Sequence, residues 1–140
     1  AMSSLDPKHL KRNAENVVDP VMDKIGRALG VELGRRLIRA TPVDTGRARS
    51  NWNTSLESPD ATTTDAKVKS GAPAFNALNR TTSAFKISDG DVMYLTNGLP
   101  YIERLNDGYS AQAGKRFIEA AVLQVEALVP RIAKRFRHRG

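Results

Sequence analysis

The sequence predicts an α+β fold, in which long N- and C-terminal helices pack on a small antiparallel sheet and one short helix lies between them. Apolar residues recur at helical spacing near both ends of the chain, over 21–40 and from about residue 115 onward. The centre instead holds two short strand-like segments bounded by turn residues. At 140 residues we expect a single domain over 1–140, with residues 1–5 and 131–140 flexible.

The first long helix is expected over about 21–40. Asp19-Pro20 is a typical helix start, because Asp caps free amides and proline fits the first turn, and Asp6-Pro7 gives the same signal earlier. Thr41-Pro42 ends the helix, since the residue before proline is pushed out of the α region. Three small residues at four-residue spacing indicate that a neighbouring element packs closely here: Gly26, Gly30 and Gly34.

The next segment is expected to contain a strand, a loop and the inner helix. A turn over 43–46 leads into a strand over 48–56, in which Trp52 and alternate residues after it face one side. Residues 57–70 are polar and are expected to form a mobile loop. Apolar residues at helical offsets then predict the short inner helix over 72–85.

The second half is expected to supply the other strand and the last long helix. Residues 92–96 favour a strand, which Asn97-Gly98 closes. A single helical turn is expected over 100–105, with proline in its first turn. Pro130 should bend or split the last helix. That helix carries the most pronounced apolar stripe of the chain: Phe117, Ile118, Ala121, Val122, Val125, Leu128, Val129, Ile132 and Phe136.

The composition is that of an ordinary folded protein with an excess of basic residues. Hydrophobic residues make up 40%, and 22 Lys and Arg against 15 Asp and Glu give a net charge of +7. The absence of cysteine excludes a disulfide scaffold and a thiolate metal site. No apolar run reaches the about 18 residues of a membrane span. The polar N-terminus is unlike a signal peptide, and Ala1 before Met2 resembles a cloning remnant. We therefore expect a protein of the cytoplasm.

The net charge is distributed in three blocks, of +4 over 1–49, −2 over 50–114 and +5 over 115–140. The C-terminal basic run could contact phosphates and release counterions from a nucleic acid. It could equally be the solvated end of a helix, where cations complement the macrodipole. The candidates for nucleic-acid contact are Arg131, Lys134, Arg135, Arg137 and Arg139.

Signatures of catalysis are sparse in the sequence. The two histidines, His9 and His138, lie in the terminal segments, which disfavours a histidine-based triad or a multi-histidine metal site. No phosphate-binding glycine loop is present. An enzyme would need Asp89, Asp91 and Glu103 to converge in a cleft, whereas the two aspartates suit a solvated turn. We expect no enzymatic activity, no cofactor and no metal.

Two dense patches of turn and aromatic residues remain. The first runs from Thr41 to Trp52 and the second from Tyr94 to Ser110. Trp52 and Tyr101 are the large aromatic anchor of each patch, and both can be read as core residues.

The segments TPVDTGR and YLTNGLPYIERLNDGYSAQA resemble the tail-completion proteins, or head–tail connector (neck) proteins, of tailed bacteriophages. That family shows a PVDTG-R turn after an N-terminal helix, then an N…PYA…E-G segment and a C-terminal helix. The resemblance covers roughly residues 20–129. The chain departs from it after Gln112-Ala113, where Gly114-Lys115-Arg116 replaces a proline-containing QAP-G turn.

The resemblance implies a minor structural protein of the virion, without catalytic activity, that completes the neck or the top of the tail. Its implied partners are copies of itself in a ring and the adjacent neck, connector and tail-tube proteins, with DNA in the channel as a further candidate. The implied location is the virion neck or tail, and the host cytoplasm during assembly. The alternative is a basic nucleic-acid-binding module.

The resemblance assigns Asp44, Thr45, Gly46 and Arg47 to the turn motif, and Asn97, Tyr101, Glu103 and Gly108 to the second motif. These motif residues, together with Pro42 and Trp52, are expected mainly to fix the fold, with Arg47 pairing a carboxylate such as that of Glu103. Residues 57–70 and the two termini would become ordered in the assembled ring. The oppositely charged blocks of the chain could meet between neighbouring subunits, where they would give orientation more than affinity.

Overall fold

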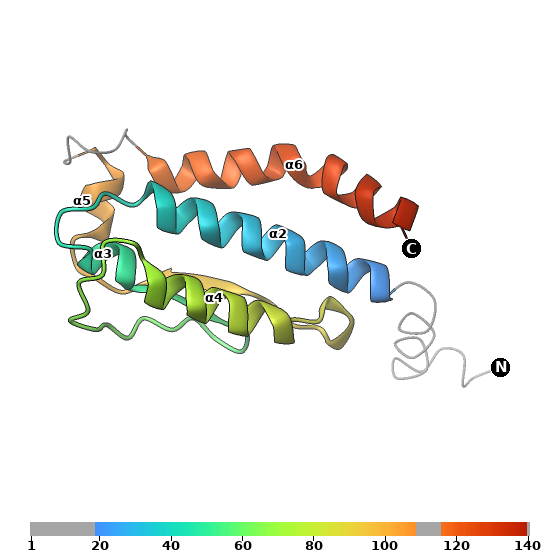
Figure 1. Ribbon diagram of the computed structural model, residues 1–140, viewed down its shortest axis with the longest axis horizontal. Coiled ribbons are helices and arrows are strands. Elements are labelled where there is room, and N and C mark those ends of the chain that lie inside the picture. Colours follow the sequence, from blue (N-terminus) through green and yellow to red (C-terminus); the bar gives the residue numbers. More distant parts are fainter. Residues whose placement is uncertain (1–18, 109–115, 140) are drawn as a thin grey trace.

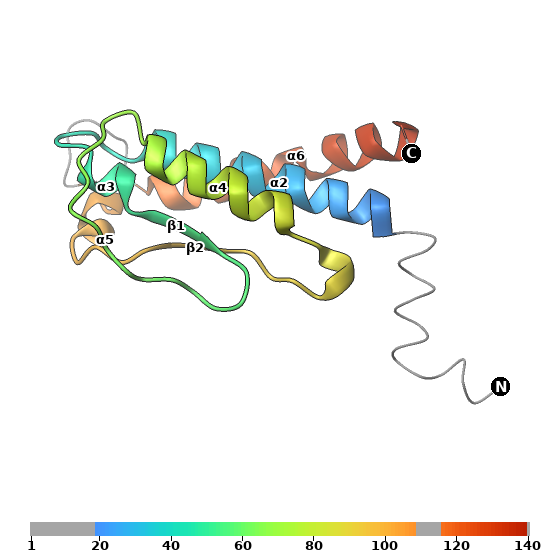
Figure 2. The same ribbon diagram turned by 60° about the horizontal axis from the view of Figure 1, so that its bottom comes forward.

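The computed structural model describes residues 19–108 and 116–139. Over these residues it contains five α-helices, one 3₁₀ helix and a two-stranded antiparallel sheet, which confirms the α+β fold class. Helix α6 (Phe117–Arg139) packs along α2 (Asp19–Ala40), and α2 packs along α4 (Ala72–Ala84) (Figure 1). Helix α4 in turn lies over the sheet (Figure 2). None of the helices in these two ranges is long and apolar enough to cross a membrane.

Helix α2 confirms the prediction for the N-terminal helix. It begins at Asp19 and ends at Ala40, directly before Thr41-Pro42. The amide of Thr41 makes the last helical bond, to the carbonyl oxygen of Leu37 at 3.2 Å. The next residue is Pro42, which has no amide hydrogen to continue the pattern. The earlier Asp6-Pro7 helix start lies outside the described residues.

The three small residues on α2 do accommodate a close approach, although the neighbours are side chains and not a backbone. A β-carbon at any of these positions would lie 2.4–2.6 Å from a side-chain atom of another element. Such a distance is well inside van der Waals contact. Gly26, Gly30 and Gly34 face, in that order, the side chains of Ile87, Met93 and Leu78.

The strand predicted over 48–56 begins later than expected. Gly46 adopts a left-handed conformation with φ of 89°, and the next residues form a helical turn, α3 (Arg47–Ser50). Strand β1 (Trp52–Ser55) follows and pairs antiparallel with β2 (Tyr94–Asn97), so that Trp52 lies opposite Asn97. The prediction missed the helical turn because alternation of apolar and polar residues cannot show that a left-handed glycine redirects the chain.

Residues 57–70 form an irregular loop, as predicted, and side chains of β1 and its flank hold the loop backbone. The side-chain oxygen of Asn51 accepts from the amide of Thr64 at 2.8 Å, and its Nδ2 donates to the Thr64 carbonyl oxygen at 3.0 Å. Nδ2 of Asn53 donates to the carbonyl oxygens of Asp60 and Thr62 at 2.8 and 2.7 Å. The mobility of this loop stays a prediction.

Two short elements connect α4 to the last helix. The 3₁₀ helix η2 (Ile87–Asp89) occupies the predicted turn near residues 88–91. Helix α5 (Ile102–Asn106) replaces the helical turn predicted over 100–105. Pro100 therefore lies before the helix, and its predicted place in the first helical turn is wrong. It belongs instead to a separate turn, in which the amide of Ile102 donates to the carbonyl oxygen of Leu99 at 3.2 Å.

A buried acid joins α2 to η2. Asp23 is 7% exposed, and its carboxylate accepts from the amide and the hydroxyl of Ser88 at 3.0 and 2.9 Å. Burial by itself raises the pKa of this carboxyl, but the two bonds from Ser88 and the charges of Arg27 and Lys86 leave the pKa below its ordinary value. The charged carboxylate of Asp23 therefore links α2 to η2, through residues about 65 positions apart in the sequence.

Helix α6 begins and runs as predicted, with two corrections. Pro130 lies inside the helix and does not split it, and the bend that was the other predicted effect stays a prediction. The first correction is that the helix extends to Arg139, so residues expected to be flexible from 131 onward are helical up to that point. The apolar stripe is also narrower than predicted. Val122 and Val129 are 38% and 39% exposed, because α2 covers the helix along one row of residues alone. The buried members of that row are Phe117, Ala121, Val125 and Ile132.

The hydrophobic core forms where α2, β1, α4 and α6 meet. Ile38 and Leu78 are its most buried large side chains, at 1% and 0% exposure. Trp52 of β1, at 5% exposure, completes the core from the side of the sheet. The buried cluster consists of Leu37, Ile38, Trp52, Ala74, Leu78, Phe117 and Ala121. The core thus places both motif patches at the end of the molecule where α6 begins and α2 ends (Figure 1).

Candidate functional site

The two motif patches, far apart in sequence, interlock in space. Asn97 lies opposite Trp52 in the sheet, and its Nδ2 donates to the carbonyl oxygen of Ala48 in α3 at 2.9 Å. Its side-chain oxygen accepts from the amide of Leu99 at 3.2 Å and shapes the turn that follows β2. The Nδ2 of this asparagine therefore joins the second patch to the first, while its side-chain oxygen stabilises the second patch itself.

Trp52 ties the first patch to the end of α2. The Nε1 of Trp52 donates to the hydroxyl of Thr41 at 2.8 Å, and this hydroxyl donates to the carbonyl oxygen of Leu37 at 2.6 Å. All of these groups are buried, so the indole nitrogen and the threonine hydroxyl satisfy one another away from water. The reading of Trp52 as a core residue is confirmed.

The turn before α3 packs against the loop that follows β1. A β-carbon on Gly46 would lie 2.5 Å from the backbone nitrogen of Lys69, so both the positive φ and the close backbone require glycine. Arg47 contacts the same loop, with its Nη2 3.5 Å from an Asp65 oxygen. Arg47 thus pairs with a carboxylate, as expected, but Glu103 as the example of that partner is wrong, because Arg47 points toward the loop and Glu103 is exposed on α5.

An unpredicted arginine holds the same corner together. Arg49 donates to three backbone carbonyl oxygens, those of Arg39 at 2.8 Å, Lys69 at 3.0 Å and Thr41 at 3.1 Å. Burial lowers the pKa of Arg49. The guanidinium thus joins the end of α2 to the loop through backbone carbonyl oxygens, an arrangement that residue spacing does not reveal.

A hollow of about 330 Å³ lies beside the turn, between the first patch and α5. Tyr101 lines it and is half-buried, so the reading of this tyrosine as a core residue holds only in part. Asp44 and Thr45 stand exposed at the rim, and Gly108 ends the second patch with φ of 94°. The hollow is lined by Pro42, Asp44, Thr45, Gly46, Ala48, Tyr101 and Leu105.

The second patch also caps the last helix, through a residue that the sequence reading did not single out. Asn106 is 8% exposed, and its side-chain oxygen accepts from the amide of Ile118 at 2.8 Å. Its Nδ2 donates to both oxygens of Glu119 at 2.9 and 3.0 Å, and this bond lowers the pKa of that carboxyl. Asn106 therefore joins α5 to the first turn of α6.

The residues that an enzyme would have required do not converge. Asp89 and Asp91 lie at η2, and Glu103 lies on α5 at the opposite end of the molecule (Figure 1). Asp91 uses one oxygen to accept from the amide of Lys86 at 2.9 Å, a bond that stabilises its own turn. Over the described residues no group of three or more His, Asp or Glu side chains could hold a metal ion.

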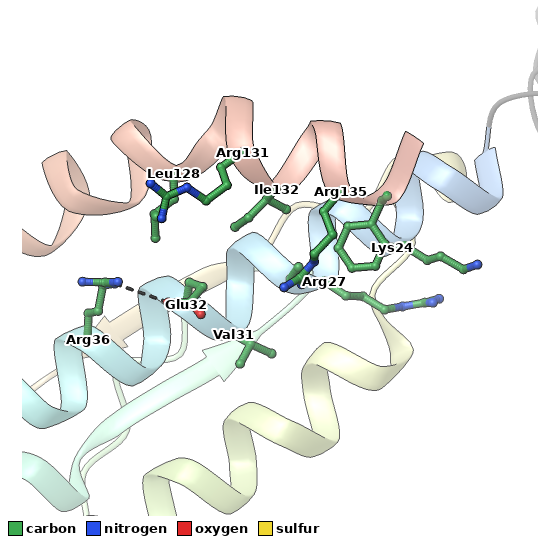
Figure 3. A pocket seen from close by; sticks show the side chains of 11 residues that line it. Lys24, Arg27, Val31, Glu32, Arg36, Leu128, Arg131, Ile132 and Arg135 are labelled. Atoms are coloured by element: carbon green, nitrogen blue, oxygen red, sulfur yellow. Dashed lines mark hydrogen bonds and ion pairs between the residues drawn. The ribbon is translucent and has the colours of Figure 1, made fainter. Parts of the chain in front are cut away.

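A groove of about 550 Å³ runs between α2 and the second half of α6 (Figure 3). Its floor is apolar and includes Val31, Leu128 and Ile132. Its rim carries five cations, which are Lys24, Arg27, Arg36, Arg131 and Arg135, and one acid, which is Glu32. We call this the basic groove, with lining residues Lys24, Arg27, Ala28, Val31, Glu32, Arg36, Leu128, Arg131, Ile132, Arg135 and Phe136.

The cations of the basic groove are held to different degrees. Arg36 pairs with Glu32 at 3.4 Å and donates to the side-chain oxygen of Gln124 on α6 at 3.0 Å. Arg27 donates to the carbonyl oxygen of Phe85 at 2.9 Å. Arg131 is exposed, and Arg135 lies over the ring of Phe136 at 4.8 Å. Most of this positive charge thus faces solvent above an apolar floor.

The predicted C-terminal basic cluster is divided by the helix. Arg131 and Arg135 are one turn apart and both line the groove, whereas Lys134 and Arg137 are exposed on other sides of α6. The side chain of Arg139 lies outside the described residues. The sequence analysis missed the contribution of α2 to this groove, which is Lys24, Arg27 and Arg36. Their spacing of three and nine residues along one helix could have indicated a shared basic side.

A comparison with protein-family models, with curated proteins and with solved structures finds no match to this chain.

Proposed function

We propose that this protein is a non-enzymatic structural protein of a tailed-phage virion, which completes the neck or the top of the tail and joins head to tail by assembling into a ring. The observation that carries the proposal is the bond from Asn97 to the carbonyl oxygen of Ala48. It links the second segment of the resemblance to Ala48, which directly follows the first segment, and this contact supports the view that the two segments belong to one structural unit.

The chemistry of the motif residues supports a structural role. Trp52 and Asn97 direct their polar side-chain atoms at groups of the same chain. Gly46 is used for a left-handed turn and a close backbone contact. Residues used in this way define a fold, so contacts with neck partners would be made by other surfaces, such as the helical faces.

The neck role is tested in infected cells. Immunogold labelling of virions should place the protein at the head–tail junction, and phages that lack it should accumulate filled heads and separate tails. Adding the purified protein to such an extract should restore joined particles. Label at the tail tip or in the head interior, or normal virions without the protein, would refute this role.

The basic groove favours a second candidate, a nucleic-acid-binding module. Five cations on one rim are a suitable surface for phosphates. Duplex DNA would then bind with sub-micromolar affinity and with a steep dependence on salt, and charge reversal at Arg131 would reduce the salt slope by about one. A mobility-shift series across salt, with Arg80→Glu on the exposed face of α4 as the matched control, distinguishes this function.

A further inference from the structure

One side of α6 carries an exposed apolar row that no element of the described chain covers. Leu123 is 64% exposed, and Val122 and Val129 are 38% and 39% exposed. Glu126 lies between them on the same side, since positions three to four apart share one side of a helix. We call this the acidic stripe, with residues Glu119, Val122, Leu123, Glu126 and Val129.

The acidic stripe and the basic groove have complementary chemistry. From Phe117 to Val129 the charged residues of α6 are Glu119 and Glu126, both acids. The groove offers five cations around an apolar floor. Each surface therefore combines large apolar side chains with charge of one sign, and the signs are opposite.

The two surfaces lie on opposite sides of the same helix. An α-helix turns by about 100° per residue, and the row that α6 buries contains Ala121, Val125 and Ile132. Residues 122, 126 and 129 fall to one side of this row, whereas 124, 131 and 135 fall to the other, where they meet α2 and the groove. A single chain therefore cannot bring its own stripe into its own groove.

We propose that the acidic stripe of one copy docks into the basic groove of the next copy, and that this head-to-tail contact is the repeating interface of the assembly. The inference rests on the proposed function in that it names the surfaces through which the ring forms. Contacts between two different surfaces continue from copy to copy, and they close into a ring or extend as a filament. Glu126 would lie among the rim arginines and the valines would cover the apolar floor.

A second copy fits the groove better than a nucleic acid does. Val31, Leu128 and Phe136 line its floor, and phosphates would leave these apolar groups uncovered. A helix with apolar and acidic residues at spacings of three and four satisfies both the floor and the rim, as in helix-in-groove recognition. The exposed row on α6 is such a helix.

The absence of cysteine allows a direct test by crosslinking. The double variant Ala28→Cys/Leu123→Cys places one thiol in the groove and one on the stripe. With a short bismaleimide, it should give a ladder of dimers, trimers and larger species. Each single variant should remain largely uncrosslinked, because a head-to-tail contact never brings two identical positions together. The matched control Ala28→Cys/Asn76→Cys, with its second thiol on exposed α4, should give no ladder.

Charge-reversal variants provide a second test of the proposed interface. In the double-cysteine background, Glu126→Lys or Arg131→Glu should each weaken association about tenfold, and more salt should have a similar effect. Arg80→Glu on α4 should leave the ladder unchanged. Circular dichroism should show that each variant is folded, since all three positions are exposed.

The remaining outcomes separate the competing explanations. Efficient dimers from Leu123→Cys alone would mean a symmetric pairing of two α6 helices and would overturn the proposal. An absent ladder, or a ladder equal to that of the Asn76 control, would also overturn it, as would DNA binding that Arg131→Glu abolishes without any ladder. A crosslinking ladder without immunogold label at the virion neck would support this interface and refute the neck role. Label at the neck without a ladder would support the neck role and refute this interface.

Discussion

Replacing Gly34 by alanine should destabilise the protein, although alanine favours a helix. Gly34 lies in α2, where a β-carbon would be 2.4 and 2.6 Å from the two δ-carbons of Leu78 and 3.0 Å from its γ-carbon. Favourable contacts between carbon atoms begin near 3.5 Å, so Leu78 or the whole of α4 would have to move by about 1 Å.

The magnitude follows from two opposing effects. The higher helix propensity of alanine contributes about 1 kcal/mol of stability. Overpacking a core costs about 1–3 kcal/mol. The upper end applies here, because Leu78 is 0% exposed and the neighbouring Ile38 and Ala74 are each 1% exposed. We therefore expect a net loss of about 2 kcal/mol, which lowers Tm by about 4–8 °C in a domain of this size.

Thermal and urea unfolding followed by circular dichroism measure this loss, and two further variants isolate its cause. In Gly30→Ala the new β-carbon meets the end of the Met93 side chain, which is flexible and half-buried, so stability should change by less than about 1 kcal/mol. In a Leu78→Val background, which lacks the δ-carbons, Gly34→Ala should be neutral or stabilising. The double-mutant cycle should give a coupling of about 2 kcal/mol.

The same loss of stability in the wild-type and Leu78→Val backgrounds would refute the contact as the cause. A Gly34→Ala protein at least as stable as the wild type would refute the reasoning as a whole, since helix propensity would then outweigh packing at a fully buried position.

Four further predictions concern the ties between elements. Trp52→Phe removes the bond to the Thr41 hydroxyl and should lower the free energy of unfolding by about 1–2 kcal/mol in urea titrations, whereas an equal stability would mean that the bond contributes nothing. Arg49→Lys cannot reach three carbonyl oxygens at once and should cost about 1–2 kcal/mol in the same assay, with Arg80→Lys on α4 unchanged. Asp23 has a folded pKa below the ordinary value of 3.8 that it takes in the unfolded chain, so the unfolded state binds more protons near that pH. The stabilisation that Asp23 gives should be complete above about pH 5 and lost as the pH falls through the folded pKa, so that stability curves of the wild type and Asp23→Asn converge toward acid pH; parallel curves would contradict this. Asn106→Ala uncaps the first turn of α6 and should cost about 1 kcal/mol, and hydrogen exchange should speed up at residues 118–120 before it does in the rest of the helix.

The motif residues were found from the sequence, but their partners were not. Arg47 was expected to pair with a carboxylate such as that of Glu103, and the carboxylate it pairs with is that of Asp65 in the loop. The sequence supplies the charges, and the left-handed turn at Gly46 decides the direction in which the arginine points. Arg49 and Asn106 were missed for another reason: Arg49 binds backbone carbonyl oxygens and Asn106 binds the amide of Ile118, and every residue has such backbone groups, so no spacing distinguishes them.

The sequence by itself determined the α+β class, the presence of both long helices and of an inner helix, and the end of the first long helix, because helical periodicity and proline boundaries are local properties of the chain. It also determined the positive charge near the C-terminus. Only the tertiary structure decided that Arg131 and Arg135 share a groove with Lys24 and Arg27, and that Val122 and its neighbours remain exposed on the other side of α6. Which side of an amphipathic helix is covered depends on the helix packed against it, and that partner lies about 90 residues away in the sequence.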